Sequence, residues 1–179
     1  MADISLIANE VRQTDSPTKR QEVRKSRILV VEDNAFVRES VVNLIDSQPD
    51  LSCCGEADSL NSTPAKVTRC KPDLILMDVR FKDGEAFDLI NSLTLTPLRP
   101  AILVLSRCEE ILYAERALQA GARGYVMKAE AADELLSAIR TVLRGRVYLS
   151  PAMSARLVQR VLKPSMKAME SDGPGKVPG

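Results

Sequence analysis

The sequence contains no histidine among its 179 residues. This absence excludes a Ser-His-Asp triad, a Cys-His nucleophile pair and any zinc site that uses imidazole ligands. The chain also cannot itself carry phosphohistidine. Any chemistry must therefore use carboxylates, hydroxyls, lysines, thiols or a metal ion held by oxygen ligands.

Long apolar runs are missing as well. No stretch reaches the roughly 18 apolar residues that are needed to cross a bilayer. The first residues, MADISLIANEVRQ, lack the basic start and apolar block of a secretory signal. The formal net charge of +1 gives no global attraction to nucleic acid or to an anionic membrane. We therefore expect a cytoplasmic protein without a membrane partner.

The cysteines form no C-x-x-C motif. Cys53 and Cys54 are adjacent within an apolar, strand-like stretch, so their sulfurs should point to opposite faces of a sheet. We interpret these two, together with Cys70 and Cys108, as reduced and partly buried thiols. A redox switch is the alternative.

Five short apolar runs alternate with segments of helical periodicity. A continuous apolar run is typical of a parallel strand that is covered on both faces, and strict alternation with helices indicates an α/β fold with a doubly wound parallel sheet. The ligand site of such a sheet lies beyond the carboxyl ends of its strands. The predicted strands cover 28–31, 51–57, 74–77, 101–106 and 124–127, and the predicted helices lie near 36–45, 58–70, 86–90, 111–118 and 134–143.

The two ends of the chain have a different character. Residues 1–26 are polar without a sustained period, which predicts a flexible N-terminal extension. After Ser150, a candidate N-cap, residues 149–162 predict an accessory or linker helix with Met153, Leu157, Val158, Val161 and Leu162 on one face. Residues 163–179 are rich in proline and glycine, which favours a flexible tail or an interdomain linker.

Polar side chains follow four of the predicted strands. Glu32 and Asp33 come after the first, Asp78 after the third, Ser106 ends the fourth and Lys128 follows the fifth. Each of them alone is consistent with a helix cap or a solvated loop residue. Together they meet at one sheet edge, where three carboxylates repel one another unless a cation binds between them. Oxygen ligands of this kind suit Mg²⁺.

The same set of residues fits phosphoryl transfer to a carboxylate. Asp78 is the only acid that ends the central strand, so it is the natural nucleophile. A magnesium ion can offset the charge that develops in the transition state, while Lys128 and Ser106 can bind phosphoryl oxygens.

Four blocks of the sequence resemble a known family. ILVVEDN, PDLILMD, AILVLS and AGARGYVMK are similar to the signature blocks of the response-regulator receiver domain, over about residues 27–148. The resemblance implies a flavodoxin-like fold of five βα units with strand order 2-1-3-4-5, to which the C-terminal helix is an addition. It also implies a two-component signalling protein that takes its phosphoryl group from a sensor histidine kinase or a phosphotransfer protein.

The resemblance assigns a role to each site residue. Glu32 and Asp33 become the acidic pair that holds Mg²⁺, directly or through water, with the backbone carbonyl of Arg80 as a further ligand. Asp78 becomes the phosphorylated aspartate and Lys128 the phosphate-pairing lysine. Ser106 becomes the switch hydroxyl, and Tyr125 its aromatic rotamer partner. The output is a change in protein–protein binding, which includes a homodimer; the chain is not an enzyme beyond Mg²⁺-dependent self-phosphorylation and slow self-dephosphorylation.

The last matching block resembles the NarL/FixJ subfamily, whose members continue into a LuxR-type helix-turn-helix domain. That domain needs roughly 55–60 further residues, whereas the segment after Tyr148 is the 31 residues 149–179. We therefore expect no DNA binding by this chain alone. It is either a stand-alone receiver or the receiver half of a DNA-binding transcriptional regulator.

Three positions depart from the family pattern. No proline follows shortly after Asp78, Ala129 replaces the usual residue after the lysine, and Arg107 replaces the usual small residue after the switch hydroxyl. Arg107 is therefore expected to modulate access to the pocket. These departures keep open a receiver-like interaction module that works without phosphorylation. A haloacid-dehalogenase-type hydrolase needs a second acid where Arg80 stands, so the sequence disfavours this class of enzyme. A nucleotide-binding fold is also disfavoured, because it needs a glycine-rich loop after the first strand and the sequence has none there.

Overall fold

The computed structural model describes residues 24–107, 111–129 and 132–162. No helix within these ranges is long and apolar enough to span a membrane. The strands are β1 (Ser26–Val31), β2 (Leu51–Ala57), β3 (Leu74–Met77), β4 (Arg80–Phe81), β5 (Gly84–Glu85), β6 (Ala101–Ser106), β7 (Gly124–Met127) and β8 (Tyr148–Leu149). The helices are α1 (Ala35–Asp46), α2 (Thr63–Cys70), α3 (Phe87–Thr94), α4 (Ile111–Gln119), α5 (Ala132–Leu143) and α6 (Pro151–Leu162).

Six parallel strands form one sheet in the order β2-β1-β3-β6-β7-β8. Because β6 and β7 are the fourth and fifth predicted strands, the predicted order 2-1-3-4-5 and the flavodoxin-like fold are confirmed. The sixth strand, β8, and the antiparallel hairpin β4–β5 were not predicted. Each of these strands has only two residues, which is too short to show a hydrophobic period.

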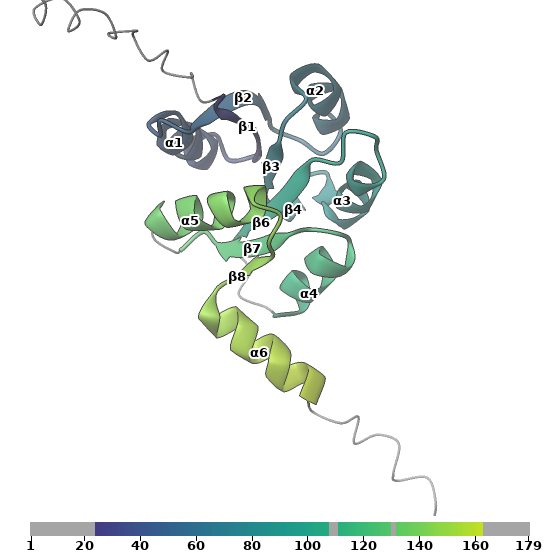
Figure 1. Cartoon of the computed structure of the whole chain (residues 1–179). Helices are drawn as coiled ribbons and strands as arrows, with labels where there is room; N and C mark the ends of the chain where they lie inside the picture. Colours follow the sequence, from purple (N-terminus) through teal and green to yellow (C-terminus); the bar gives the residue numbers. More distant parts are fainter. Residues whose placement is uncertain (1–23, 108–110, 130–131, 163–179) are drawn as a thin grey trace, which may run out of the picture.

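Helices cover both faces of the sheet (Figure 1). Helices α1 and α5 lie on one face, and α2, α3 and α4 lie on the other. Consecutive strand residues serve opposite layers: Ile28 and Val30 pack with α1 and α5, whereas Leu29 and Val31 pack with the other layer. A central strand that is buried on both faces therefore needs an apolar residue at every position.

The helix after β8 is anchored at its start. The backbone N–H of Met153 donates to Ser150 Oγ at 3.3 Å, so the predicted N-cap is confirmed. Met153 is buried and Leu157 is half-buried against the α4 side of the core. Val158, which the sequence places on the same helical face, is 56% exposed. The side chains of Val161 and Leu162 lie outside the described set.

The two neighbouring cysteines point to opposite layers, as predicted. Cys53 packs with the α1–α5 layer and Cys54 with the other. A register shift of β1 against β2 falls at Cys54, because Ile28 pairs with Cys53 and Leu29 pairs with Gly55. Burial raises the pKa of the Cys54 thiol to about 11, which leaves little thiolate for oxidation near neutral pH.

The terminal segments of the sequence fall mostly outside the described part. Strand β1 begins at Ser26, one residue before the predicted start of the receiver domain, and β8 crosses its predicted end at Tyr148. The predictions for residues 1–23, for the tail 163–179 and for Cys108 concern residues outside the described ranges. Arg24 and Lys25 are the residues of the N-terminal extension before β1 that the structure describes.

The start of β7 has no room for a side chain. A Cβ atom on Gly124 would lie 2.8 Å from Leu103 Cδ1 and 2.8 Å from the carbonyl oxygen of Tyr148. We expect Gly124→Ala to lower the free energy of unfolding by about 1–3 kcal/mol, because overpacking at a backbone atom cannot be relieved by a rotamer change. Urea denaturation measures this, with Ser137→Ala on the exposed side of α5 as control; equal midpoints for the two variants would contradict the crowding.

Candidate functional site

Four strands of the sheet end in polar side chains at the same edge. Glu32 and Asp33 follow β1, Asp78 follows β3, Ser106 ends β6 and Lys128 follows β7. The ladder of backbone hydrogen bonds continues past these ends. The amide of Asp78 donates to the last carbonyl of β1 at 3.0 Å, and the amide of Lys128 donates to Ser106 O at 2.8 Å. The backbone therefore brings together all five residues that the strand-end pattern selected.

Lys128 lies between two carboxylates. Its Nζ atom is 2.5 Å from Glu32 Oε2 and 2.5 Å from Asp78 Oδ2. The three side chains are almost entirely buried, with 8%, 4% and 5% exposure for Lys128, Glu32 and Asp78. Two carboxylates in so dry a place repel each other strongly unless a cation is shared. The ammonium group is thus the counter-charge that lets both lie at this edge.

The backbone fixes the orientation of Asp78. Its Oδ1 atom accepts hydrogen bonds from the N–H of Val79 at 2.6 Å and of Arg80 at 3.3 Å, while Oδ2 contacts Lys128. The hairpin β4–β5 starts at Arg80 and pairs it with Glu85, which holds the turn after Asp78 in place. The role of the Arg80 carbonyl as a metal ligand stays a prediction.

Asp78 opens on a pocket of about 350 Å³. Ser106 is fully buried in its wall, Asp33 is half-buried, and Arg80 and Arg107 are exposed. The pocket therefore joins the candidate nucleophile to the surface, with Arg107 in the lining where the sequence predicted an effect on access. The residues that complete the lining, and that sequence reasoning missed, are Phe81 and Lys82.

The donor set at the pocket fits a magnesium ion. Asp33 and Asp78 line the same space, whereas Glu32 contacts Lys128 and accepts from the backbone N–H of Asn34 at 3.2 Å. Within the described ranges, no group of three or more His, Cys, Asp or Glu side chains surrounds one metal position. Mg²⁺ keeps several waters and is often bound by one or two carboxylates, so Asp33 and Asp78 provide the type and number of protein ligands that this ion needs.

The two predicted switch residues lie on adjacent strands. Ser106 ends β6, and Tyr125 on β7 pairs in register with Val104, two residues earlier on β6. Tyr125 is 1% exposed and belongs to the core cluster that includes Ala114 of α4 and Met153 of α6. The ring of Tyr125 is therefore buried in the core in this structure, and its role as a switch residue stays a prediction.

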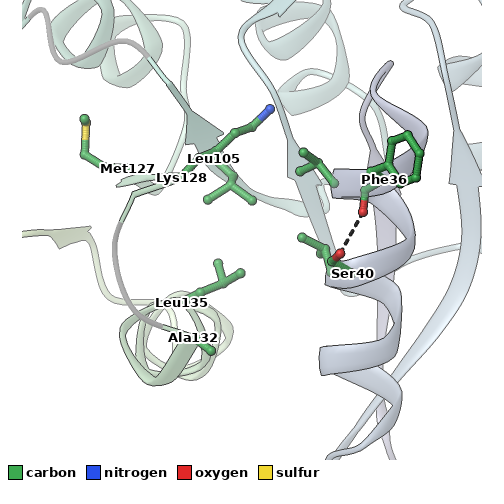
Figure 2. Close-up of a pocket in the computed structure, with 9 residues that line it drawn as sticks. Phe36, Ser40, Leu105, Met127, Lys128, Ala132 and Leu135 are labelled. Atoms are coloured by element: carbon green, nitrogen blue, oxygen red, sulfur yellow. Dashed lines mark hydrogen bonds between the residues drawn. The ribbon is translucent and has the colours of Figure 1, made fainter.

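A second pocket adjoins the site between α1 and α5. It measures about 310 Å³ and includes Lys128 in its lining. Figure 2 shows Ala132 and Leu135 on α5 across from Phe36 and Ser40 on α1. Phe36 is 83% exposed, which is unusual for a phenylalanine. The sequence showed these residues only as helix positions, because the spacing between two helices is not visible in either one alone.

Comparison with known proteins identifies the family of this chain. The profile of the response regulator receiver domain matches residues 28–140. The response regulator GacA of Pseudomonas viridiflava is 31% identical over 140 residues, which are 78% of this chain and 65% of GacA. The DNA-binding transcriptional activator DevR/DosR of Mycobacterium tuberculosis is 33% identical over 137 residues, which are 75% of this chain and 62% of that protein.

A solved structure gives the same result for the fold. The crystal structure of a two-component response regulator of the LuxR family from Aurantimonas sp. is 26% identical, covers 78% of this chain and 100% of its own, and superimposes with a TM-score of 0.73. The chain spans less than two thirds of the length of the curated relatives described above. Since the receiver profile covers most of the folded body, the chain belongs to the response regulator receiver family of two-component systems.

Proposed function

We propose that Asp78 accepts a phosphoryl group, with Mg²⁺ bound at the same pocket, from a sensor histidine kinase or a phosphotransfer protein. The observation that carries this proposal is the position of Lys128 Nζ, 2.5 Å from Asp78 Oδ2, beside a pocket open over the aspartate. The ammonium group of a buried lysine at this place can pair with the carboxylate before transfer and with a phosphoryl oxygen during transfer, which stabilises the negative charge at each stage. Receiver domains generally bind Mg²⁺ for phosphorylation, which supports the metal.

Each residue of the site has a defined task in this proposal. A carboxylate oxygen of Asp78 attacks phosphorus, and the two backbone N–H groups on Oδ1 keep the carboxylate in position. Asp33, Asp78 and the Arg80 carbonyl would hold the metal, which would offset the negative charge that develops during transfer. Lys128 and Ser106 bind the oxygens of the transferred group. Glu32 keeps Lys128 aimed at Asp78.

The output is a change of binding partner, and the chain is not a turnover enzyme. Ser106 and Tyr125 lie on neighbouring strands, and Tyr125 packs in one cluster with residues of α4 and α6. Drawing Ser106 toward a phosphoryl group changes the space beside Tyr125 and biases two packings of this layer. The altered surface binds a second copy or a protein target, in the cytoplasm, as part of a DNA-binding regulator or beside one.

The apolar pocket between α1 and α5 is suited to the phosphodonor protein. Lys128 lines this pocket and also contacts Asp78, so a partner bound in the pocket lies next to the proposed acceptor. Its apolar lining and the exposed Phe36 fit an amphipathic helix.

We expect Phe36→Ser to slow transfer from a phosphorylated histidine phosphotransfer protein at least threefold, measured with radiolabelled phosphate, because a central aromatic contact is lost. The rate with acetyl phosphate should be unchanged; an equal loss with both donors would place the effect within the site itself.

A working acceptor gains mass on one residue. Incubation with acetyl phosphate and Mg²⁺ should add one phosphoryl group to the wild type, seen by intact mass spectrometry, and none to Asp78→Asn. Asp88→Asn, which alters an exposed acid in the first turn of α3, should behave as the wild type. Absence of an adduct on the wild type under every condition would favour the module that acts without phosphorylation, for which Arg107 at the pocket is the supporting observation.

Metal binding should depend on Asp33. We expect Mg²⁺ to raise the melting temperature of the wild type, because it binds the folded state. A ligand present at a free concentration of 100 times its Kd raises the free energy of unfolding by about 2.7 kcal/mol. Asp33→Asn should reduce this shift most strongly, since Asp33 lines the pocket without contact to Lys128 in the ion pairs described above. A thermal shift titration with Ca²⁺-free MgCl₂ measures it, and a full shift in Asp33→Asn would exclude this aspartate as a ligand.

A further inference from the structure

Three neighbouring loops line the edge of the sheet that lies opposite the phosphoryl site. The loops 95–100, 120–123 and 144–147 precede β6, β7 and β8, which are adjacent parallel strands, so the loops follow one another along this edge. A hydrogen bond joins the second loop to the third, because Arg123 Nη1 donates to Gly145 O at 3.5 Å. The three loops therefore form one continuous surface, which we call the amino edge.

The amino edge contains four arginines and no acid. Arg99, Arg123, Arg144 and Arg146 are all exposed, and none of them forms an ion pair with another described residue. The sequences of the three loops, LTPLRP, AGAR and RGRV, include neither aspartate nor glutamate. The net charge of +1 conceals this local excess of positive charge, because it is a sum over the whole chain.

Exposed apolar side chains lie among these arginines. Leu95, Leu98 and Val147 are 77%, 45% and 57% exposed. Leu98 is a central residue of a turn in which the N–H of Arg99 donates to Thr96 O at 3.2 Å. Arg99 has a φ of 39°, in the left-handed region that residues with a side chain rarely adopt. The turn thus presents an apolar side chain to solvent directly beside a cation.

The helix dipoles explain only part of this arrangement. Helices α3, α4 and α5 end at the amino edge, where the negative ends of their dipoles favour cations. That interaction accounts for the sign of the charge, but it gives no reason for leucine and valine side chains to be exposed to water among the arginines. Exposed apolar side chains with a polar rim are typical of a surface that binds a protein or a membrane.

We propose that the amino edge binds the surface of an anionic lipid bilayer. Lipid phosphate groups complement the guanidinium groups, which can each donate two parallel hydrogen bonds, and the boundary of the acyl chains takes up Leu95, Leu98 and Val147. A nucleic acid would satisfy the arginines but not the apolar side chains. The three loops also contain no aromatic residue that could stack on bases.

Binding at the amino edge leaves the phosphoryl site accessible. Asp78 follows the carboxyl end of β3, whereas the three loops precede the strands beside it, so Asp78 faces away from the bilayer. The chain is thereby held at a membrane surface with its proposed acceptor on the side of the aqueous phase. Attachment of this kind needs no helix that crosses the membrane, and it does not depend on phosphorylation.

Co-sedimentation of the full chain with lipid vesicles tests the proposal. We expect binding to vesicles of phosphatidylglycerol and phosphatidylcholine in equal parts, none to phosphatidylcholine alone, and weaker binding when salt is added. Arg99→Gln and Arg146→Gln should each lower the affinity about fivefold, because each removes one cation from the anionic surface. Lys82→Gln is the matched control, since it removes an exposed charge near the carboxyl edge, and it should bind as the wild type does.

The apolar side chains distinguish a bilayer from a nucleic acid. Leu98→Ser should lower the affinity for anionic vesicles about three- to tenfold, because the burial of one apolar side chain is lost. Leu112→Ser is the matched control: Leu112 is 44% exposed, which is close to Leu98, but it lies in the first turn of α4, away from the amino edge. Both substitutions are at exposed positions, so the melting temperatures should stay near that of the wild type.

Absence of binding to anionic vesicles at low salt would overturn the proposal. Binding to duplex DNA of arbitrary sequence that depends on Arg99 and Arg146 but not on Leu98, without binding to vesicles, would assign the amino edge to nucleic acid instead. Equal binding to neutral vesicles, or an equal loss in Lys82→Gln, would overturn the role of the arginines. The adduct formed with acetyl phosphate reports separately on Asp78, so the proposed function stands or falls independently.

Discussion

The contact of one ammonium group with two buried carboxylates decides how the carboxyl edge of the sheet is built. Lys128 binds Glu32 and Asp78 at the same time, and these residues follow three different strands, β7, β1 and β3. The lysine therefore acts across the width of the sheet and not only within one loop. Because Glu32 and Asp78 would repel each other without it, the acidic site and the order of the strands depend on each other. A different strand order would leave the lysine without its carboxylates and the carboxylates without their cation.

The sheet divides the molecule into two layers that differ in their surfaces. The α1–α5 layer adjoins Lys128 through an apolar pocket, so a partner that binds there lies beside Asp78. The opposite layer contains Tyr125 with residues of α4 and α6. Strand alternation produces this division, because neighbouring residues of β6 and β7 point to opposite faces. In the proposed function, phosphoryl transfer and the change of binding would thus use different faces of one sheet.

The features that could be predicted from the sequence are those that each strand or helix shows by itself. A strand buried on both faces is a continuous apolar run, and a polar residue directly after it lies at the carboxyl edge; Glu32, Asp33, Asp78, Ser106 and Lys128 were found in this way. Strand β8 and the hairpin β4–β5 were missed because two residues have no period. The exposure of Val158 could not be predicted, because helical spacing places it on one face with Met153 and Leu157 but does not show how far the neighbouring elements cover that face. The separate directions of Glu32 and Asp33, one toward the lysine and one into the pocket, depend on side-chain torsions that a sequence pattern does not contain.

The C-terminal part of the body is attached differently from the rest. Strand β8 pairs with β7 over only two residues, Gly124 with Tyr148 and Tyr125 with Leu149, and α6 follows after a single residue, Ser150. The hydroxyl of Tyr148 donates a further hydrogen bond to Glu134 of α5. With so few backbone hydrogen bonds, we expect β8 to open locally at a lower free energy than β1, β3 and β6. Amide exchange would then be slower in the central strands than in β8. Because Leu149 pairs with Tyr125, opening of β8 would change the packing of the buried Tyr125 ring.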